Sequence, residues 1–140
     1  MADDRIRLQV ITQGGVKLDK MVSYVNIPLE GGSIGVLADH APTLAAVTDG
    51  AVKCTTAAGQ DEFAYVGTGV AQIMNNDVIL LVRAAECAEN IDLARARAAE
   101  SRAEERLNSK AADIDMIRAE AALRRAMARE HTYNAWRNDD

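Results

Sequence analysis

The chain has 140 residues and a formal net charge of −5, and 49% of its residues are hydrophobic but only 4% are aromatic. This length suits one domain or two very small ones, and the negative charge argues against general nucleic-acid binding, which depends on neutralising phosphates. Cys54 and Cys87 lack any CxxC pairing, which argues against a zinc site and against a disulfide framework.

The first part of the chain predicts short strands separated by turns. Ile6, Leu8 and Val10 alternate with polar residues, which is the period of a half-buried strand. A second alternating run follows the Gly14-Gly15 turn and is expected to end at Pro28. Further strands are expected at residues 34–37, 51–56, 62–66, 70–74 and 78–84. Many short strands with polar turns between them indicate an antiparallel β-sandwich, or flattened barrel, over residues 1–87.

The sequence predicts neither a signal peptide nor a membrane-spanning segment. Residues 1–5 show no signal-peptide pattern, and the apolar run at residues 78–82 is far too short to span a bilayer. We therefore expect a cytosolic protein that reaches a membrane only through a partner.

The period changes to that of a helix after residue 90. Asn90 is expected to be the N-cap, with Asp92 in the first turn, where a carboxylate meets the positive end of the helix. The helix is expected to run to about Leu107, and residues 108–110 read as a break.

A second helix is expected to begin at a cap formed by Asp113 or Asp115 and to run to about His131. A short loop favours an antiparallel helical hairpin, here over residues 88–140. The predicted fold class is therefore α+β, a β-sandwich followed by a two-helix hairpin.

Both helices are rich in alanine, which favours helix but contributes little area for burial. Each helix should be stable while its docking is weak. Such a hairpin suits a conformational switch, and it is equally compatible with an ordinary two-helix appendage.

Four arginines have spacings that bring them together. Arg95 and Arg102 are seven residues apart on the first helix, and Arg125 and Arg129 are four apart on the second. In an antiparallel hairpin the two pairs approach each other across the seam, where guanidinium groups could bind phosphate in bidentate fashion.

Two carboxylates near the helix start, Glu86 and Asp92, could accept hydrogen bonds from a base or a sugar. The competing explanation is that the arginines pair with nearby glutamates on solvated helix faces, namely Glu100, Glu104, Glu105 and Glu120. From spacing alone this second explanation is the more common one.

The sequence offers no convincing catalytic constellation, so we predict that the chain is not an enzyme. Gly67-Thr68-Gly69 lacks the third glycine of a dinucleotide fingerprint, and no phosphate-loop motif is present. His40 and His131 are the two histidines, and neither belongs to a nucleophile or metal-ligand pattern. His40 is expected to order a turn or to meet a partner.

Three segments carry a resemblance to a known family. They are Gly35-Val36-Leu37-Ala38-Asp39-His40-Ala41-Pro42, Ile91-Asp92-Leu93-Ala94-Arg95-Ala96 and Arg124-Arg125-Ala126-Met127-Ala128-Arg129. Together with the order of strands and helices, they resemble the epsilon subunit of bacterial F-type ATP synthase over residues 5–129.

The resemblance implies a non-catalytic rotor subunit of the central stalk. In the family the sandwich contacts the gamma subunit and the ring of membrane c subunits, and nucleotide chemistry belongs to the alpha and beta subunits. The hairpin either folds on the sandwich or extends into the catalytic head, where it inhibits ATP hydrolysis. The expected location is the cytoplasmic face of the bacterial plasma membrane, as a peripheral subunit.

The resemblance also implies a regulatory ATP site, and it reverses the preference for the solvated alternative. In some members the folded hairpin binds ATP through an Ile-Asp-x-x-Arg-Ala pattern. That pattern and the family alignment point to Glu86, Ile91, Asp92, Arg95, Ala96, Arg102, Arg125 and Arg129. No cofactor is required for the rotor role, and the sequence leaves the involvement of Mg²⁺ open.

Ser33 and His40 are the candidate partner contacts. The loop of residues 31–33 lacks the acidic side chain that some members present near the c ring. Glu130 stands where relatives usually have an apolar residue, and the resemblance does not extend to the tail of residues 131–140. Two other functions remain open, a free-standing ATP sensor and a structural adaptor without ligand.

Overall fold

A computed structural model describes residues 5–109 and 113–139, which form a β-sandwich followed by two helices. The strands are β1 (Ile6–Thr12), β2 (Gly15–Val22), β3 (Tyr24–Leu29), β4 (Gly32–Leu37), β5 (Thr43–Val47), β6 (Gly50–Thr55), β7 (Asp61–Val66), β8 (Gly69–Met74), β9 (Asp77–Val82) and β10 (Ala85–Cys87). A 3₁₀ turn, η1 (Ala88–Asn90), leads into α1 (Leu93–Asn108), and α2 is Asp113–Arg137. The predicted α+β fold class is confirmed.

The sandwich is one hydrogen-bonded sheet folded around a single apolar core. The strand order is β10-β7-β6-β3-β5-β8-β9-β1-β2, with β4 pairing β3. In β1 the side chains of Ile6, Leu8 and Val10 are buried, as their alternation predicts. The pairing differs from the expected antiparallel pattern in one place, because β1 lies parallel to β9. These two strands are far apart in the chain, so no tight hairpin dictates their relative direction.

Several details of the strands were not predicted. β5 and β10 were missed, and the run expected at residues 78–84 ends at Val82 as β9. The single run expected between the Gly14-Gly15 turn and Pro28 is two strands, β2 and β3. β3 continues through Pro28 to Leu29 instead of ending at the proline. Pro28 lies where the neighbour of β3 changes from β6 to β5, and its carbonyl accepts a hydrogen bond from the Thr48 amide at 3.2 Å. A missing amide hydrogen is tolerated at such a change of neighbour.

The helices also differ in detail from the prediction. Asp92, not Asn90, is the N-cap of α1, while Asn90 ends the preceding 3₁₀ turn. The α2 helix runs to Arg137, beyond the expected end at His131. The proposed caps at Asp113 and Asp115 are wrong, because both residues lie inside α2, whose first residue is Asp113.

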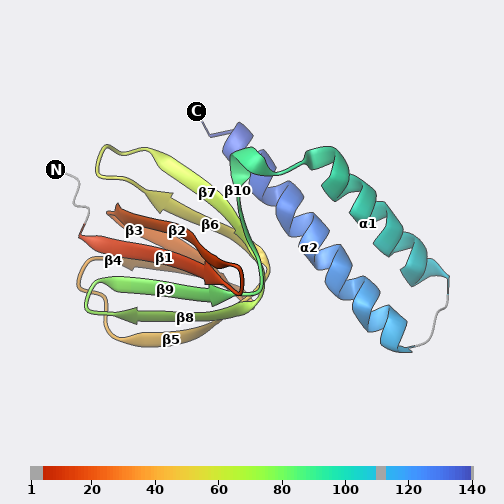
Figure 1. Ribbon diagram of the computed structural model, residues 1–140, viewed down its shortest axis with the longest axis horizontal. Helices are drawn as coiled ribbons and strands as arrows, with labels where there is room; N and C mark the ends of the chain where they lie inside the picture. Colours follow the sequence, from red (N-terminus) through yellow and green to blue (C-terminus); the bar gives the residue numbers. More distant parts are fainter. Residues whose placement is uncertain (1–4, 110–112, 140) are drawn as a thin grey trace.

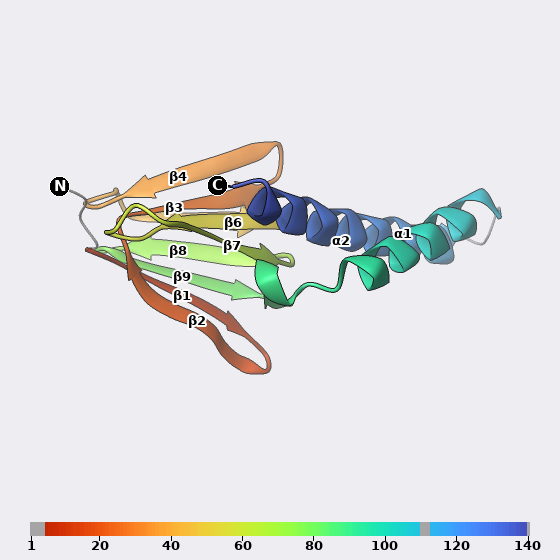
Figure 2. The same ribbon diagram turned by 90° about the horizontal axis from the view of Figure 1, so that it is seen from above.

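The hairpin meets the sandwich at one end only. The later part of α2 (blue in Figure 1) packs against β6, β7 and η1, and α1 packs along α2. Seen from above, the far end of the hairpin projects away from the strands (Figure 2). Among residues 5–109 and 113–139, neither helix is long and apolar enough to cross a membrane.

Gly69 gives a test of the close approach of β8 and β9. A Cβ added to Gly69 would overlap the backbone carbonyl of Leu81. We expect Gly69→Ala to lower the free energy of unfolding by about 1–3 kcal/mol, because backbone atoms must move to relieve the overlap. Gly32→Ala is the matched control, since no atom lies within 4 Å of its added Cβ. Urea unfolding of the full chain measures both, and equal stability of the two variants would contradict the strand packing.

Candidate functional site

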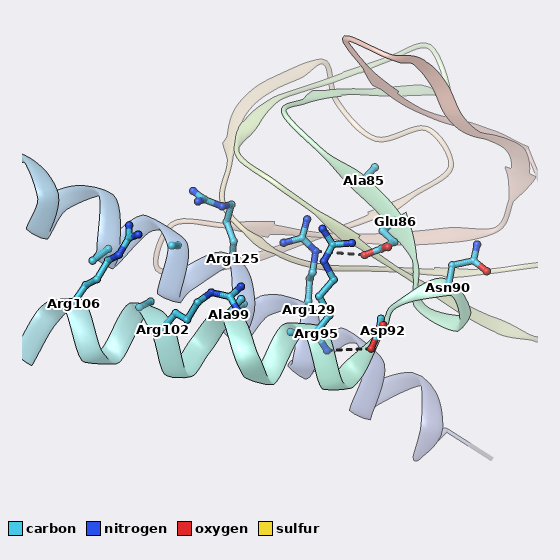
Figure 3. Close-up of a pocket in the computed structure, with 15 residues that line it drawn as sticks. Ala85, Glu86, Asn90, Asp92, Arg95, Ala99, Arg102, Arg106, Arg125 and Arg129 are labelled. Carbon is cyan, nitrogen blue, oxygen red and sulfur yellow. Dashed lines mark hydrogen bonds and ion pairs between the residues drawn. The ribbon is translucent and has the colours of Figure 1, made fainter.

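A cavity of about 640 Å³ lies between the two helices and the end of the sandwich (Figure 3). Its lining comes from three parts of the chain, namely β10 with η1, α1 and α2. The lining residues are Ala85, Glu86, Asn90, Asp92, Arg95, Ala96, Ala99, Arg102, Ala103, Arg106, Ala119, Ala122, Arg125, Ala126 and Arg129. The volume suits a ligand of the size of a nucleotide.

The cavity wall is strongly basic. Five guanidinium groups face two carboxylates, those of Glu86 and Asp92, so the lining has a net charge of +3. Figure 3 shows that the basic side chains come from both helices and point towards the same space. Such a wall is complementary to a polyanion, because each guanidinium can donate two parallel hydrogen bonds to phosphate oxygens.

Most of these arginines are not engaged by carboxylates of the protein. Within the described residues no ion pair joins Arg95, Arg102, Arg106 or Arg125 to an acidic side chain. The alternative of local pairing with glutamates on the helix faces is therefore not what the described structure contains. Four uncompensated guanidinium groups around one cavity favour an external anion.

Arg129 is the exception. Its Nε lies 3.4 Å from Oε1 of Glu86, and its guanidinium carbon lies 4.3 Å from the ring centroid of Tyr65. Tyr65 is fully buried, and its hydroxyl donates a hydrogen bond to Oδ1 of Asp49 at 3.3 Å. Burial raises the pKa of Tyr65 to about 12, although the charge of Arg129 opposes this shift. Arg129 thus belongs both to the cavity and to the contact between hairpin and sandwich.

Asp92 has a structural role of its own at the cavity mouth. Its side chain accepts a hydrogen bond from the backbone amide of Arg95 at 3.0 Å. One of the free amides at the start of α1 is satisfied in this way, which is the usual function of an N-cap aspartate.

Seven of the eight residues singled out from the sequence line this cavity, and Ile91 does not. Ile91 is buried in a small apolar cluster with Tyr65 and Ala128. Two polar lining residues were not predicted, Asn90 and Arg106. Arg106 follows Arg102 by one helical turn, and this spacing could have identified it.

Ser33 and His40 lie apart from this cavity and from each other. Ser33 is near the start of β4, whereas His40 lies three residues beyond its end. Nδ1 of His40 is 2.8 Å from the Ala41 carbonyl, and the Asp39 amide donates to the side chain of Asn76 at 2.6 Å. These contacts order the turn around His40. A single small contact cannot include both candidate residues, because the length of a strand separates them.

Glu130 links the two helices. One of its carboxylate oxygens lies 3.9 Å from Nε of Arg97, and the other is buried without a hydrogen-bond partner in the described part of the chain. The acidic residue that the sequence marks as unusual therefore lies at the helix–helix contact.

Two family profiles together match most of the chain. The beta-sandwich domain of the ATP synthase delta/epsilon chain matches residues 5–88, and the long alpha-helix domain of the same chain matches residues 89–132. The ATP synthase epsilon chain of Bacillus velezensis is 40% identical over 124 residues, covering 89% of this chain and 93% of the relative. That of Natranaerobius thermophilus is 36% identical over 141 residues, covering all of both chains.

A solved structure shares the fold. A chain in the Euglena gracilis mitochondrial ATP synthase, in a structure of OSCP, F1 and the c-ring, superposes with a TM-score of 0.82 at 22% identity. The superposition covers 97% of this chain and 84% of that chain.

The cap at Asp92 can be tested separately from any ligand. We expect Asp92→Ala to destabilise the first turn of α1 by about 0.5–2 kcal/mol, because the Arg95 amide loses its acceptor. Asp92→Asn is the matched control, since asparagine caps about as well. Hydrogen exchange at the Arg95 amide measures the effect in the full chain, and unchanged protection in Asp92→Ala would contradict the capping role.

Proposed function

The chain belongs to the delta/epsilon family of ATP synthase, and on this premise we propose that it is a regulatory rotor subunit whose hairpin binds ATP when folded. In this proposal the chain catalyses no reaction. The sandwich couples the gamma subunit to the c ring at the cytoplasmic face of the bacterial plasma membrane. The extended hairpin reaches the alpha and beta subunits and inhibits ATP hydrolysis.

An apolar patch on the outer face of the sandwich supports a protein partner there. Leu44, Val70 and Leu81 are 78%, 49% and 50% exposed. They lie on the adjacent strands β5, β8 and β9, and Val70 is directly opposite Leu81. A contiguous exposed patch of this kind is typical of an interaction surface. We assign it to the gamma subunit, which would cover it in the assembled enzyme.

The observation that carries the ATP proposal is the basic cavity, in which four arginines form no ion pair with an acidic side chain of the described residues. The triphosphate would lie among the arginines of the two helices, and the base or sugar would lie near Asp92 and Asn90. A dianionic or more highly charged phosphate chain would offset the repulsion between neighbouring guanidinium groups. ATP should therefore bind more tightly than a nucleotide with fewer phosphates.

The same geometry links ATP to the position of the hairpin. Glu86 of β10 and the arginines of both helices line one cavity only while the hairpin is folded against the sandwich. A ligand that binds the folded form alone shifts the population towards it by its differential affinity. ATP would thus favour the non-inhibitory form, and a low ATP concentration would release the helices.

Two other functions give different results in simple experiments. A free-standing ATP sensor would not co-purify with the gamma subunit. A structural adaptor would neither bind ATP nor inhibit hydrolysis when its helices are retained.

Arg125 tests the ligand. We expect Arg125→Ala to weaken ATP binding about tenfold or more, because a charge-assisted hydrogen bond to phosphate is lost. Arg124→Ala is the matched control, since Arg124 is the exposed neighbour on the same helix and does not line the cavity. Calorimetry with ATP, ADP and GTP, each with and without Mg²⁺, measures both variants. Equal affinities of the two variants would contradict the assigned site.

Removal of the helices tests inhibition. We expect a chain ending at Ala88, where the sandwich profile ends, to retain binding to the gamma subunit and to abolish inhibition of ATP hydrolysis. The measurement is the ATPase rate of the reconstituted enzyme at low ATP concentration, with the full chain as control. A truncated chain that inhibits as strongly as the full chain would show that the hairpin is not the inhibitor.

A further inference from the structure

We infer that the end of α2, residues 132–137, is a latch segment that holds the hairpin folded on the sandwich without a nucleotide. This inference rests on the proposed function in one respect, that the hairpin has a folded and a released form. The matched helical profile ends at residue 132, whereas α2 continues to Arg137. The additional turn includes Trp136, the single tryptophan of the chain.

The latch segment is in the part of the hairpin that meets the strands. The strands that α2 contacts are β6 and β7, and Figures 1 and 2 both show the C-terminal end of α2 at the sandwich while the opposite end of the hairpin projects away. Thr132 is fully buried, and its hydroxyl donates to the carbonyl of Ala128 at 2.7 Å. This hydrogen bond within the helix satisfies the hydroxyl, so burial of Thr132 leaves no unpaired polar group.

Two aromatic side chains extend this contact over the sandwich. Tyr133 packs on the cluster of Tyr65, Ile91 and Ala128. The rings of Tyr133 and Trp136 meet edge to face, with their centroids 5.6 Å apart at an interplanar angle of 68°. Aromatic pairs favour this arrangement, and it holds both rings in one orientation.

Trp136 is the one described residue of α2 that lines a second cavity, of about 330 Å³, whose other lining residues include strand residues of the sandwich. Among these are Phe63, Cys87 and the ion pair between Lys20 and Glu62. The guanidinium carbon of Arg137 lies 5.7 Å from the centroid of the indole ring. The indole thus faces apolar and charged groups of the sandwich and has a cation of its own helix beside it.

The latch segment and the arginine cavity are separate. None of residues 132–137 lines that cavity, and Trp136 lines only the second one among the cavities described. The latch therefore acts whether or not a nucleotide is bound. The latch segment and a nucleotide in the arginine cavity both favour the folded form. Loss of the latch should therefore lower the fraction of folded hairpins, and the apparent ATP affinity should fall by the same factor.

Thiol labelling of the full chain without nucleotide tests the latch. Burial raises the pKa of Cys87, and it raises that of Cys54 to about 11, so both thiols should react slowly with iodoacetamide in the folded form. We expect Trp136→Ala to raise the labelling rate of Cys87 about tenfold, measured by peptide mass spectrometry. Cys54 lines the same cavity, but it is 2% exposed and belongs to the core of the sandwich, so its labelling should stay slow as long as the strands remain intact.

Two control variants isolate the indole ring. Met127→Ala removes a large apolar side chain of α2 that is 52% exposed and should change the rate less than twofold. Trp136→Phe retains an aromatic ring, so its Cys87 should be labelled at a rate close to that in the unaltered chain. A Cys87 rate in Trp136→Ala equal to that in Met127→Ala would overturn the inference.

Hydrogen exchange distinguishes release of the hairpin from fraying of its last turn. Ala88 and Ile91 are buried at the base of the hairpin, and neither lines the cavity that Trp136 lines. Release should raise exchange at residues 88–91 in Trp136→Ala. If Cys87 were labelled faster while hydrogen exchange at residues 88–91 stayed unchanged, only the last turn of α2 would have moved away from Cys87. That result would overturn the latch.

Calorimetry with ATP separates this inference from the proposed function. Release of the hairpin in Trp136→Ala, together with no ATP binding by the unaltered chain, would support the latch and reject the ATP site. Normal ATP binding with no effect of Trp136→Ala on labelling or exchange would reject the latch and leave the ATP site standing.

Discussion

The contact of Arg129 with Tyr65 and Glu86 is the interaction on which the arrangement of hairpin and sandwich depends. Tyr65 is a strand residue with no exposed surface, and the groups that cover it include Ile91 and Ala128 of the helical part. The sandwich therefore has a face that is complete only when α2 lies on it. Arg129 stacks on that face, pairs with Glu86 and also lines the arginine cavity, so docking of the helix and formation of the cavity are one event.

The alanines of the hairpin explain both the cavity and the small apolar area that the two helices bury against each other. Ala96, Ala103, Ala119 and Ala126 are almost fully buried where the helices meet and also line the cavity. A methyl group removes little apolar area from water, so each such contact stabilises the pair only slightly. The same small side chains leave space beside the backbone, into which the longer arginines project. One compositional feature thus provides room for a ligand and limits the apolar area buried between the two helices.

The sequence predicts the helices and strands whose side chains follow a clear period. It predicts less well the elements whose position is determined by contacts with distant segments of the chain. The change of period near residue 90 led to the fold class. The spacings of Arg95 with Arg102 and of Arg125 with Arg129 indicated that the two pairs approach each other, and the family resemblance turned this arrangement into a predicted ATP site. β5 was missed because it is a short strand that directly follows Pro42 and is stabilised by pairing with β8. The last turn of α2 was missed because its aromatic residues pack on strands far away in the chain, which helical periodicity cannot reveal.

In the proposed model, two attachments set how the hairpin responds to ATP, the contact of Arg129 with Tyr65 and the latch segment. If the latch segment alone kept almost every hairpin folded, ATP would have little population left to shift. If the Arg129 contact acted without the latch, fewer hairpins would be folded, and the apparent affinity for ATP would fall in proportion. The ring of Trp136 does not line the arginine cavity, and in this model it would still set the ATP concentration at which the hairpin responds.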